Sequence, residues 1–367
     1  MKFVVWHVGG GGSSLGPVEQ MLSLPGIQFE IYLFEIRTDE SAEVATLTVE
    51  QDNPNRLVKT VKIGLAGKSE SRDFFINKFD VSSSLLKPSS LTSRDNPGYS
   101  RLGGIYKNMM TWGQNTELDK IITIKVTTVD EIIATGVASP PDVLSMDIQG
   151  AELEVMQSSS LAFKNIIAVI TESEFFEIYS NQGLFDEQMS FLIDKSFRFV
   201  KFFAFQKWFP GPLVGQGFTT VTESLFIKYL VNADQLTETK KNFEKISDYS
   251  SDKIFKIALV AFAYQRFSYF FTLLNAIENS DSIFWKELQN ENKYFKYMNY
   301  YNKIKVNIPN LIADPNYFVK HPINININTN RISNISYQVL EFLVRVFRVK
   351  RILKKIINYK GVERPMD

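Results

Sequence analysis

The chain of 367 residues contains no cysteine and only two histidines, His7 and His321. The absence of cysteine excludes disulfides, thiolate metal sites and cysteine nucleophiles, and two histidines are too few for a histidine-based zinc centre. Residues 1–30 lack the basic start, apolar core and cleavage site of a signal peptide, and no run of about 18 uncharged apolar residues occurs. We therefore expect a cytoplasmic, bacterial protein that is not a zinc enzyme.

An excess of one charge is also missing, because 41 basic and 40 acidic side chains leave a net charge of +1. The balance is uneven only in residues 342–360, which hold seven Lys or Arg and no acid. The 44% of apolar residues can build a sizeable core. Length and composition together indicate one large or two medium globular domains.

Residues 1–232 alternate short apolar segments with helical patterns, which is typical of a parallel sheet covered by helices. The segments expected to be strands are 3–8, 30–36, 57–65, 142–148, 166–172, 197–205 and 224–230. A polar insertion, residues 67–120, separates the third strand from the fourth and suits an active-site cover. The helical pattern that follows predicts an accessory domain over 233–320, and residues 321–367 form a linker and a basic amphipathic C-terminal helix.

The stretch "FVVWHVGGGGSSLGP" places a run of glycines between a strand and a helix that opens at Pro17. Glycines let the backbone approach a ligand closely, and free amides at a helix start favour an anionic or polar group. Glu35 ends the next strand, where dinucleotide-binding folds place an acid that accepts hydrogen bonds from ribose. The pattern predicts a nucleotide-like cofactor; the alternatives are a turn without a ligand and a solvated strand end.

The stretch "DVLSMDIQGAELEVM" places Asp147 near the carboxyl end of a buried strand and Glu152 in the first turn of the next helix. Glu172 ends the following strand. In open α/β sheets ligands bind at this edge, so the acids mark a candidate site. The alternative is a helix start with acidic capping and no chemistry.

Taken together, these segments resemble the FkbM family of S-adenosylmethionine-dependent methyltransferases. The resemblance covers residues 3–230 and depends on the order of the glycine loop, "YLFEI", "VSSSLLKP", "VLSMDIQGAELEVM", "ITESEFFEIYSNQGLF" and "LFIKY". It implies a class I methyltransferase-like (Rossmann-like) α/β fold, with a seven-stranded sheet, an antiparallel last strand and helices on both faces. A mainly helical C-terminal region is expected beyond it. The resemblance also implies O-methylation, often of sugars in glycans or natural products.

By position, the resemblance implies that S-adenosylmethionine is bound by the loop glycines and Glu35, with the residues after the third strand near adenine. The implied cofactor-binding residues are His7, Gly9, Gly10, Gly11, Glu35, Leu65 and Ala66. His7 stands where family members tend to have an acid, and Ser13 replaces a later loop glycine. For His7, simple packing and a role as general base are the alternatives.

Methyl transfer to a hydroxyl needs the oxygen held in line with the methyl group and its proton removed, so a neighbouring carboxylate is useful. Asp147 is the candidate base or substrate anchor, Glu172 is the second carboxylate, and Glu152 caps or orients the site. Ser83 and Ser84 are candidates for binding sugar hydroxyls or the cofactor carboxylate. Two carboxylates are compatible with a divalent ion such as Mg²⁺, but no spacing supports one.

We therefore expect an O-methyltransferase that acts on a sugar hydroxyl of a glycan or glycoconjugate and binds no nucleic acid. The alternative, favoured by His7 and Ser13, is a non-catalytic binding or scaffold protein that keeps the fold. In residues 339–360, apolar side chains recur at helical spacing while basic ones gather on another face. Such a helix suits contact with the anionic inner face of the cytoplasmic membrane, or else a homo-oligomer interface.

Overall fold

The computed structural model describes residues 1–9, 15–36, 55–89, 116–208, 218–231 and 244–313. These residues belong to a first compact unit, Met1–Pro315, and a second unit comprises Asn316–Asp367. The predicted C-terminal helix, loop residues Gly10, Gly11 and Ser13, and the predicted domain boundary at residue 232 lie outside the described residues. They therefore stay predictions.

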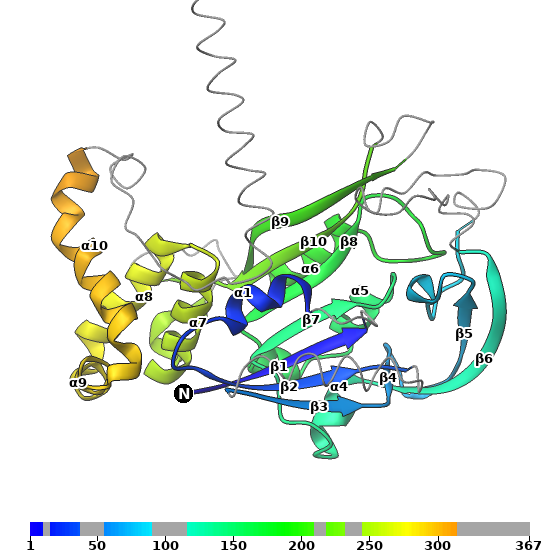
Figure 1. Ribbon diagram of the computed structural model, residues 1–367, viewed down its shortest axis with the longest axis horizontal. Coiled ribbons are helices and arrows are strands. Elements are labelled where there is room, and N and C mark those ends of the chain that lie inside the picture. The colour runs from blue at the N-terminus through cyan, green and yellow to red at the C-terminus, as the bar shows by residue number, and fades with distance from the viewer. Residues whose placement is uncertain (10–14, 37–54, 90–115, 209–217, 232–243, 314–367) are drawn as a thin grey trace, which may run out of the picture. The chain divides into compact units, whose positions relative to one another are not determined.

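A seven-stranded mixed sheet forms the centre of the first unit (Figure 1). In spatial order its strands are β3 (Arg56–Val61), β2 (Gln28–Phe34), β1 (Lys2–Gly9), β7 (Val143–Asp147), β8 (Ala168–Glu174), β10 (Phe218–Lys228) and β9 (Phe197–Trp208). Neighbouring strands are parallel except at β10, which is antiparallel to both β8 and β9. The expected class I methyltransferase-like sheet with an antiparallel last strand is confirmed.

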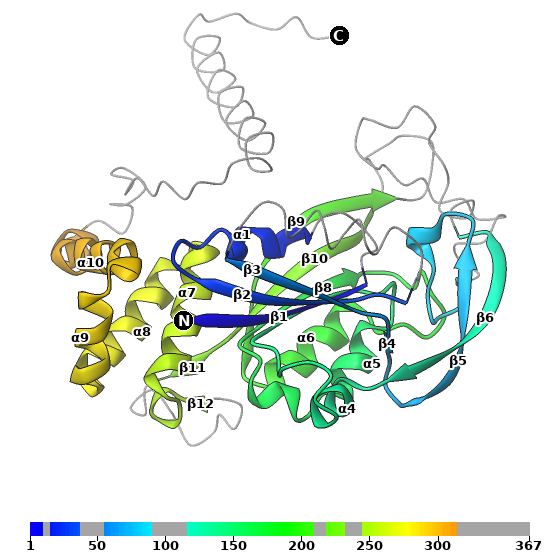
Figure 2. The same cartoon turned by 60° about the horizontal axis from the view of Figure 1, so that its bottom comes forward.

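Helices cover both faces of this sheet (Figures 1 and 2). One face carries η1 (Gly16–Val18), α1 (Glu19–Leu22) and α7 (Ser251–Ala263), and the other carries α4 (Val129–Ala134), α5 (Glu152–Gln157), η4 (Ala162–Lys164) and α6 (Phe185–Asp194). Along β1, Trp6 and Val8 belong to the core beneath α5 and α6, so the alternate residue His7 faces the side of η1 and α7. Central strands buried on both faces read as continuous apolar runs, which is why β1 and β7 were predictable.

The third predicted strand, 57–65, is divided between two sheets. Its first part is β3, whereas β4 (Gly64–Leu65) joins β6 (Leu118–Thr127) and β5 (Glu70–Asn77) in a separate three-stranded sheet. The predicted polar insertion 67–120 therefore contains β5 and the start of β6, two strands that the sequence did not predict. Both strands carry charged side chains, and β6 is largely exposed, which hid them from a search for apolar runs.

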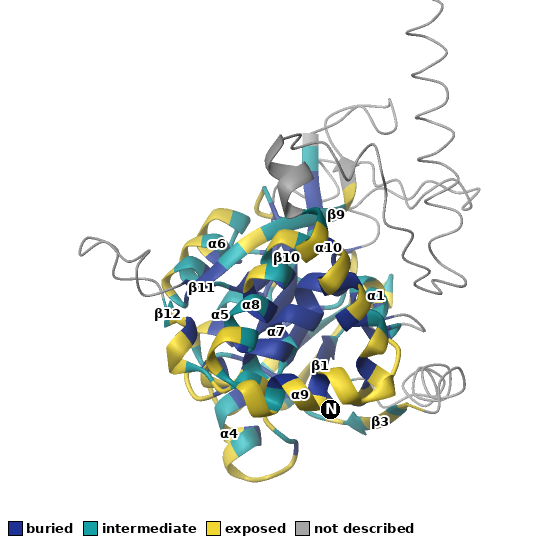
Figure 3. Ribbon diagram, turned by 90° about the vertical axis from the view of Figure 1, so that its left-hand side faces the viewer, coloured by how far each residue is buried: buried dark blue, intermediate teal, exposed yellow. Residues whose placement is uncertain are grey.

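The C-terminal helical region is present and its first helix is the most buried. After the short strands β11 (Leu230–Val231) and β12 (Glu244–Lys245) and η6 (Ile246–Asp248) come α7, α8 (Phe267–Ser280), α9 (Ser282–Asn290), η7 (Asn292–Tyr294) and α10 (Phe295–Ala313). Helix α7 is buried from Ile257 to Ala263 (Figure 3). The apolar run 258–277 is two helices, because Gln265 turns the chain at φ 61° without a glycine or proline to signal it.

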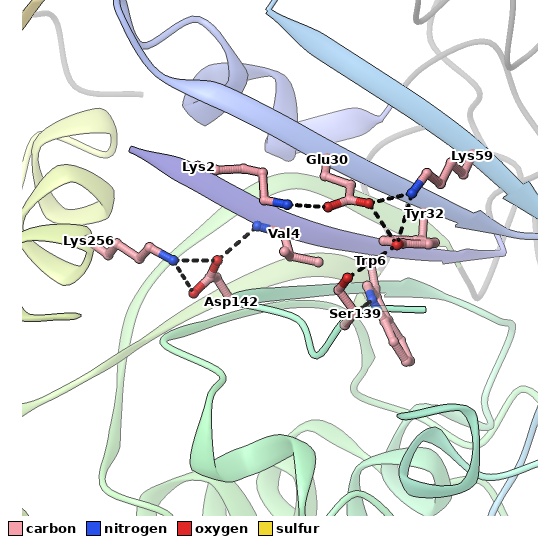
Figure 4. Close-up of polar contacts among 9 residues, drawn as sticks. All are labelled: Lys2, Val4, Trp6, Glu30, Tyr32, Lys59, Ser139, Asp142 and Lys256. Carbon is pink, nitrogen blue, oxygen red and sulfur yellow. Dashed lines mark hydrogen bonds and ion pairs between the residues drawn. The ribbon is translucent and has the colours of Figure 1, made fainter. Parts of the chain in front are cut away.

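A buried carboxylate, Glu30 on β2, ties three side chains together at the sheet (Figure 4). It accepts hydrogen bonds from Lys2 Nζ at 2.7 Å, Lys59 Nζ at 2.5 Å and the hydroxyl of Tyr32 at 2.8 Å. The bonds from Lys2 and Lys59 lower the pKa of Glu30 to about 2. The native state therefore holds this group ionised at pH values where the unfolded chain protonates it.

We expect Glu30→Gln to remove part of the acid sensitivity of folding. The lowered pKa contributes stability that is present above pH 4.5, the ordinary value, and is lost as the pH falls towards about 2. Because both lysines are partly exposed, we expect about 2 kcal/mol at neutral pH. Urea unfolding between pH 2 and 7 measures it. Glu70→Gln, at an exposed position of β5, is the control, and an equal change in both variants would contradict the prediction.

Candidate functional site

The loop between β7 and α5 is shaped by the carboxylate of Glu152, which is fully buried. It accepts hydrogen bonds from the backbone N–H of Ile148 at 2.8 Å and of Gly150 at 2.9 Å. Gln149 and Gly150 adopt left-handed conformations, with φ of 59° and 100°, so the chain turns sharply around this carboxylate. Burial raises the pKa of Glu152 to about 7, against the two amide bonds that favour its ionised form. Glu152 thus orients the loop that follows Asp147.

A row of carboxylates crosses the sheet edge beside this loop, and we call Asp147, Glu172 and Glu223 the acidic row. Glu223 of β10 pairs with Glu172 of β8, and Asp147 lies opposite Gly9 of β1. Paired residues of neighbouring strands point to the same face, which here is the face of η1 and α7. The row therefore lies at the carboxyl ends of β7 and β8, on the side of the glycine loop.

Gln149 joins two members of the acidic row. Its side-chain amide donates to Asp147 Oδ1 at 2.7 Å and to Glu172 Oε2 at 2.8 Å. The hydroxyl of Tyr179 lies 2.9 Å from Gln149 Oε1 and 2.8 Å from the backbone oxygen of Ser82, so its one hydrogen is shared between these two acceptors. Ser84 also holds this residue, because its hydroxyl donates to the backbone oxygen of Gln149 at 2.7 Å.

Burial and the neighbouring charge of Asp147 make two members of the acidic row, Glu172 and Glu223, hold protons near neutral pH. Burial and then the charge of Asp147 raise the pKa of Glu172 well above its ordinary value, and the same two causes raise that of Glu223 to about 7. Burial lowers the pKa of His7, although the charges of Asp147 and Glu35 oppose it. Carboxyls with such pKa values can exchange protons with a bound ligand near pH 7.

A cavity with about 560 Å³ of space free of protein atoms, its open mouth included, adjoins Asp147. Its polar walls come from Glu35, Asp80, Ser83, Asp147 and Gln149, and its apolar walls from Val8, Phe34, Ile36, Ile63, Leu65, Phe74, Val81, Leu85 and Ile148; Gly9 and Gly64 complete the lining. Five residues predicted from the sequence line it: Gly9, Glu35, Leu65, Ser83 and Asp147.

The other described candidates lie next to this cavity without lining it. His7 is buried and its Nδ1 lies 3.0 Å from Ser145 Oγ, so it packs within the sheet. Ala66 is buried with Phe74, Leu85 and Val126. Ser84, Glu152 and Glu172 act on the loop or on Gln149, as described above. Gly10 and Gly11 fall outside the described residues.

Three residues of this arrangement were missed in the sequence. Glu223 lies among threonines and a serine just before the predicted strand 224–230, so it carries no signal without the strand pairing, and Gln149 and Tyr179 carry none without the loop geometry. Within the part of the chain that the structure describes, no group of three or more His, Cys, Asp or Glu side chains is arranged to hold a metal ion.

Comparison with known protein families identifies the domain that contains this site. Residues 19–199 match the model of the Methyltransferase FkbM domain. The chain carries an FkbM methyltransferase domain. It is accordingly an S-adenosylmethionine-dependent methyltransferase, and S-adenosylmethionine is its cofactor.

No curated protein matches the chain. Among solved structures, one similar fold is the magnesium protoporphyrin IX methyltransferase ChlM from Synechocystis PCC 6803 with bound SAM, at 8% identity and a TM-score of 0.29. The match covers 62% of this chain and 71% of that one. Another is MtNAS in complex with MTA and tNA, at 11% identity and a TM-score of 0.25, which covers 62% of this chain and 54% of that one.

The residues around the cavity of the FkbM domain fit this cofactor. Gly9 has φ 76°, and a Cβ there would lie 2.1 Å from the carbonyl oxygen of Asp147. Only glycine therefore lets β1 end this close to the β7 loop and keeps the cavity open. Glu35 would accept hydrogen bonds from the ribose hydroxyls, and Leu65 and Ile63 would contact the adenine.

Glu35→Ala should weaken S-adenosylmethionine binding, because it removes the acceptors for the ribose hydroxyls. Hydrogen bonds to a charged group contribute roughly 1.5–3 kcal/mol each, so we expect affinity to fall at least about tenfold. Isothermal titration calorimetry measures it. Glu177→Ala removes an exposed carboxylate away from the cavity and should bind like the wild type. Unchanged affinity in Glu35→Ala would exclude the ribose role.

Proposed function

We propose that the protein transfers the methyl group of S-adenosylmethionine to a sugar hydroxyl of a glycan or glycoconjugate. The observation that supports this acceptor is the acidic row, which continues from the cavity wall at Asp147 to Glu172 and Glu223. An acceptor placed beside Asp147 would meet carboxyl oxygens from three strands. Such oxygens accept hydrogen bonds from the several hydroxyls of a sugar.

The proposed reaction is a displacement at carbon, for which the bound cofactor supplies an electrophilic methyl group on sulfur. On that cofactor the displacement would join the acceptor oxygen to the methyl carbon and would leave the electron pair of the carbon–sulfur bond on sulfur. The hydroxyl proton passes to a carboxylate oxygen of Asp147, which Gln149 holds in place at 2.7 Å. Glu172 and Glu223 orient the acceptor through its other hydroxyls.

The same charges restrict the class of acceptor. A phosphate or carboxylate placed at the acidic row would face the negative charge of Asp147 in a partly buried site, where repulsion is weakly screened. A neutral polyol meets acceptors for its hydroxyls and no repulsion. We therefore propose a neutral sugar unit at the methylated position.

The acceptor class can be tested with S-adenosylmethionine labelled in its methyl group. Neutral methyl glycosides, the same sugars as phosphate esters, and amino sugars are offered in parallel, and product is identified by NMR of the new methyl group. We expect O-methyl products from neutral sugars at rates at least about tenfold above those from the phosphate esters. Methylation on nitrogen, or a preference for the phosphate esters, would contradict the proposal, and Glu35→Ala serves as the cofactor-binding control.

We also propose that residues 339–360 bring the enzyme to the anionic inner face of the cytoplasmic membrane. No helix among the described residues is long and apolar enough to cross a membrane. The proposal depends on the basic amphipathic pattern, in which each Lys or Arg contributes about 1 kcal/mol near an anionic surface.

Cosedimentation with anionic liposomes tests this membrane contact. The full-length protein should pellet at low salt and be released at high salt, whereas a chain shortened to end at Ser336 should stay in solution. If both stay in solution, the membrane proposal fails. Self-association of the helix would then be tested by comparing the masses of the two chains by light scattering.

A further inference from the structure

A second cavity lies at the opposite edge of the large sheet from the cofactor site. It holds about 1020 Å³ of space free of protein atoms, its open mouth included. Four lysines line it, Lys164 at the end of η4, Lys195 after α6, Lys228 at the end of β10 and Lys253 in α7. Strand β8 begins near this cavity and ends at Glu174 near the acidic row, so roughly 20 Å separate the two sites.

The ammonium groups of two of these lysines are held in place by the chain. Lys228 has a side chain that is only 3% exposed, and its Nζ donates to the backbone oxygen of Lys195 at 2.9 Å and to Glu244 at 3.1 Å. Lys253 Nζ donates to the backbone oxygen of Lys164. Each ammonium group has three hydrogens, so both keep donors for a ligand.

Positive charge in this cavity exceeds negative charge. Besides the four lysines, the lining contains two carboxylates, Glu244 and Asp248, which leaves two positive charges. Burial lowers the pKa of Lys228 and of Lys253, and the nearby Lys228 lowers that of Lys253 further. An anion placed among the lysines would offset the repulsion between their positive charges.

The start of α7 adds to this potential. The helix runs over 13 residues from Ser251, and its N-cap Ser250 lies in the cavity wall. The dipole of a helix of this length places partial positive charge at its start, where phosphate groups are favoured. Phe163 and Tyr249, also in the wall, offer aromatic surface to an organic group.

We propose that this cavity binds a ligand carrying a phosphate or diphosphate group, at a site separate from the site of methyl transfer. The charge left by the lysines matches a dianion, and the cavity comes from η4, α6, β10 and α7, whose positions the sheet fixes. Methyl transfer does not require this site, so the proposal does not depend on the acceptor proposed above.

Calorimetric titration of the full-length protein with pyrophosphate tests the site. We expect saturable binding that weakens at least tenfold in the double variant Lys164→Gln, Lys195→Gln. Lys164 is exposed and Lys195 is half-buried, so the buried Lys228 and the fold are kept, which thermal melting checks. Lys286→Gln removes an exposed lysine of α9 and should bind like the wild type. Absence of saturable binding, or equal binding by the double variant, would overturn the proposal.

A second experiment distinguishes a lipid headgroup from a soluble phosphate compound as the ligand. Pyrophosphate binding is repeated in the presence of vesicles of phosphatidylcholine with phosphatidic acid. Pelleting with the same vesicles is measured for the wild type and the double variant. A lipid headgroup is supported as the ligand if the vesicles weaken pyrophosphate binding to the wild type and pellet the wild type better than the double variant. Vesicles without effect on pyrophosphate binding support a soluble phosphate compound.

Discussion

Asp147→Asn should slow methyl transfer by about 10²–10⁴-fold while leaving folding and S-adenosylmethionine affinity nearly unchanged. Asparagine has the size of aspartate and keeps an oxygen for the bond from Gln149, which Asp147 accepts at 2.7 Å. What the substitution removes is the carboxylate that takes the hydroxyl proton. Single-turnover kinetics with the neutral sugar acceptor and calorimetry with the cofactor measure the two quantities separately.

The same variant has an electrostatic signature that a merely structural change would not produce. The charge of Asp147 contributes to the raised pKa of Glu172 and Glu223 and opposes the lowering at His7. Without it, the pKa of Glu223 should fall from about 7 towards its ordinary value, and that of His7 should fall further. NMR titration follows both groups. Asp119→Asn, at an exposed position of β6, is the matched control. Normal turnover in Asp147→Asn would make Asp147 structural and redirect the search to Glu172.

The sequence was most informative where chemistry and local pattern coincide. Apolar runs located the central strands, and because carboxyl ends of parallel strands share one edge, Asp147 and Glu172 could be placed together before their contacts were known. The shared partner, Gln149, could not be foreseen, because its position depends on a left-handed turn closed by Glu152.

Residues brought in by non-local pairing were the hardest to predict. Glu223 joins the acidic row only because β10 inserts between β8 and β9 and pairs Glu223 with Glu172. Register of this kind follows from the packing of the whole sheet. Strands β5 and β6 were missed because charged residues interrupt both of them and their apolar alternation is weak. For Ser84 the sequence indicated a polar loop, whereas its inward direction onto Gln149 is a property of the fold.

Gly9→Ala should be among the most damaging single substitutions at the site. A Cβ at this position would lie 2.1 Å from the backbone oxygen of Asp147 and 2.7 Å from the Ile148 side chain, and the backbone oxygen cannot rotate away. The collision can be removed only if β1 and the end of β7 move apart. Adding the cost of a left-handed alanine to that of overpacking gives about 2–5 kcal/mol of lost stability. Because the separation would move Asp147 in the cavity wall, we expect cofactor affinity to fall at least about 100-fold.

Gly136→Ala supplies the control that isolates the collision at Gly9. Gly136 follows α4 with φ 71°, close to the 76° of Gly9, but a Cβ there would meet nothing within 4 Å. This variant therefore loses only the stability that a left-handed alanine costs, about 1 kcal/mol, and should bind S-adenosylmethionine normally. Urea unfolding and calorimetry of both variants give the comparison. If the two lose the same stability and both bind the cofactor, the close approach of β1 to Asp147 is not what requires glycine at position 9, and the loop Gly10–Gly11 would have to supply the cofactor contact instead.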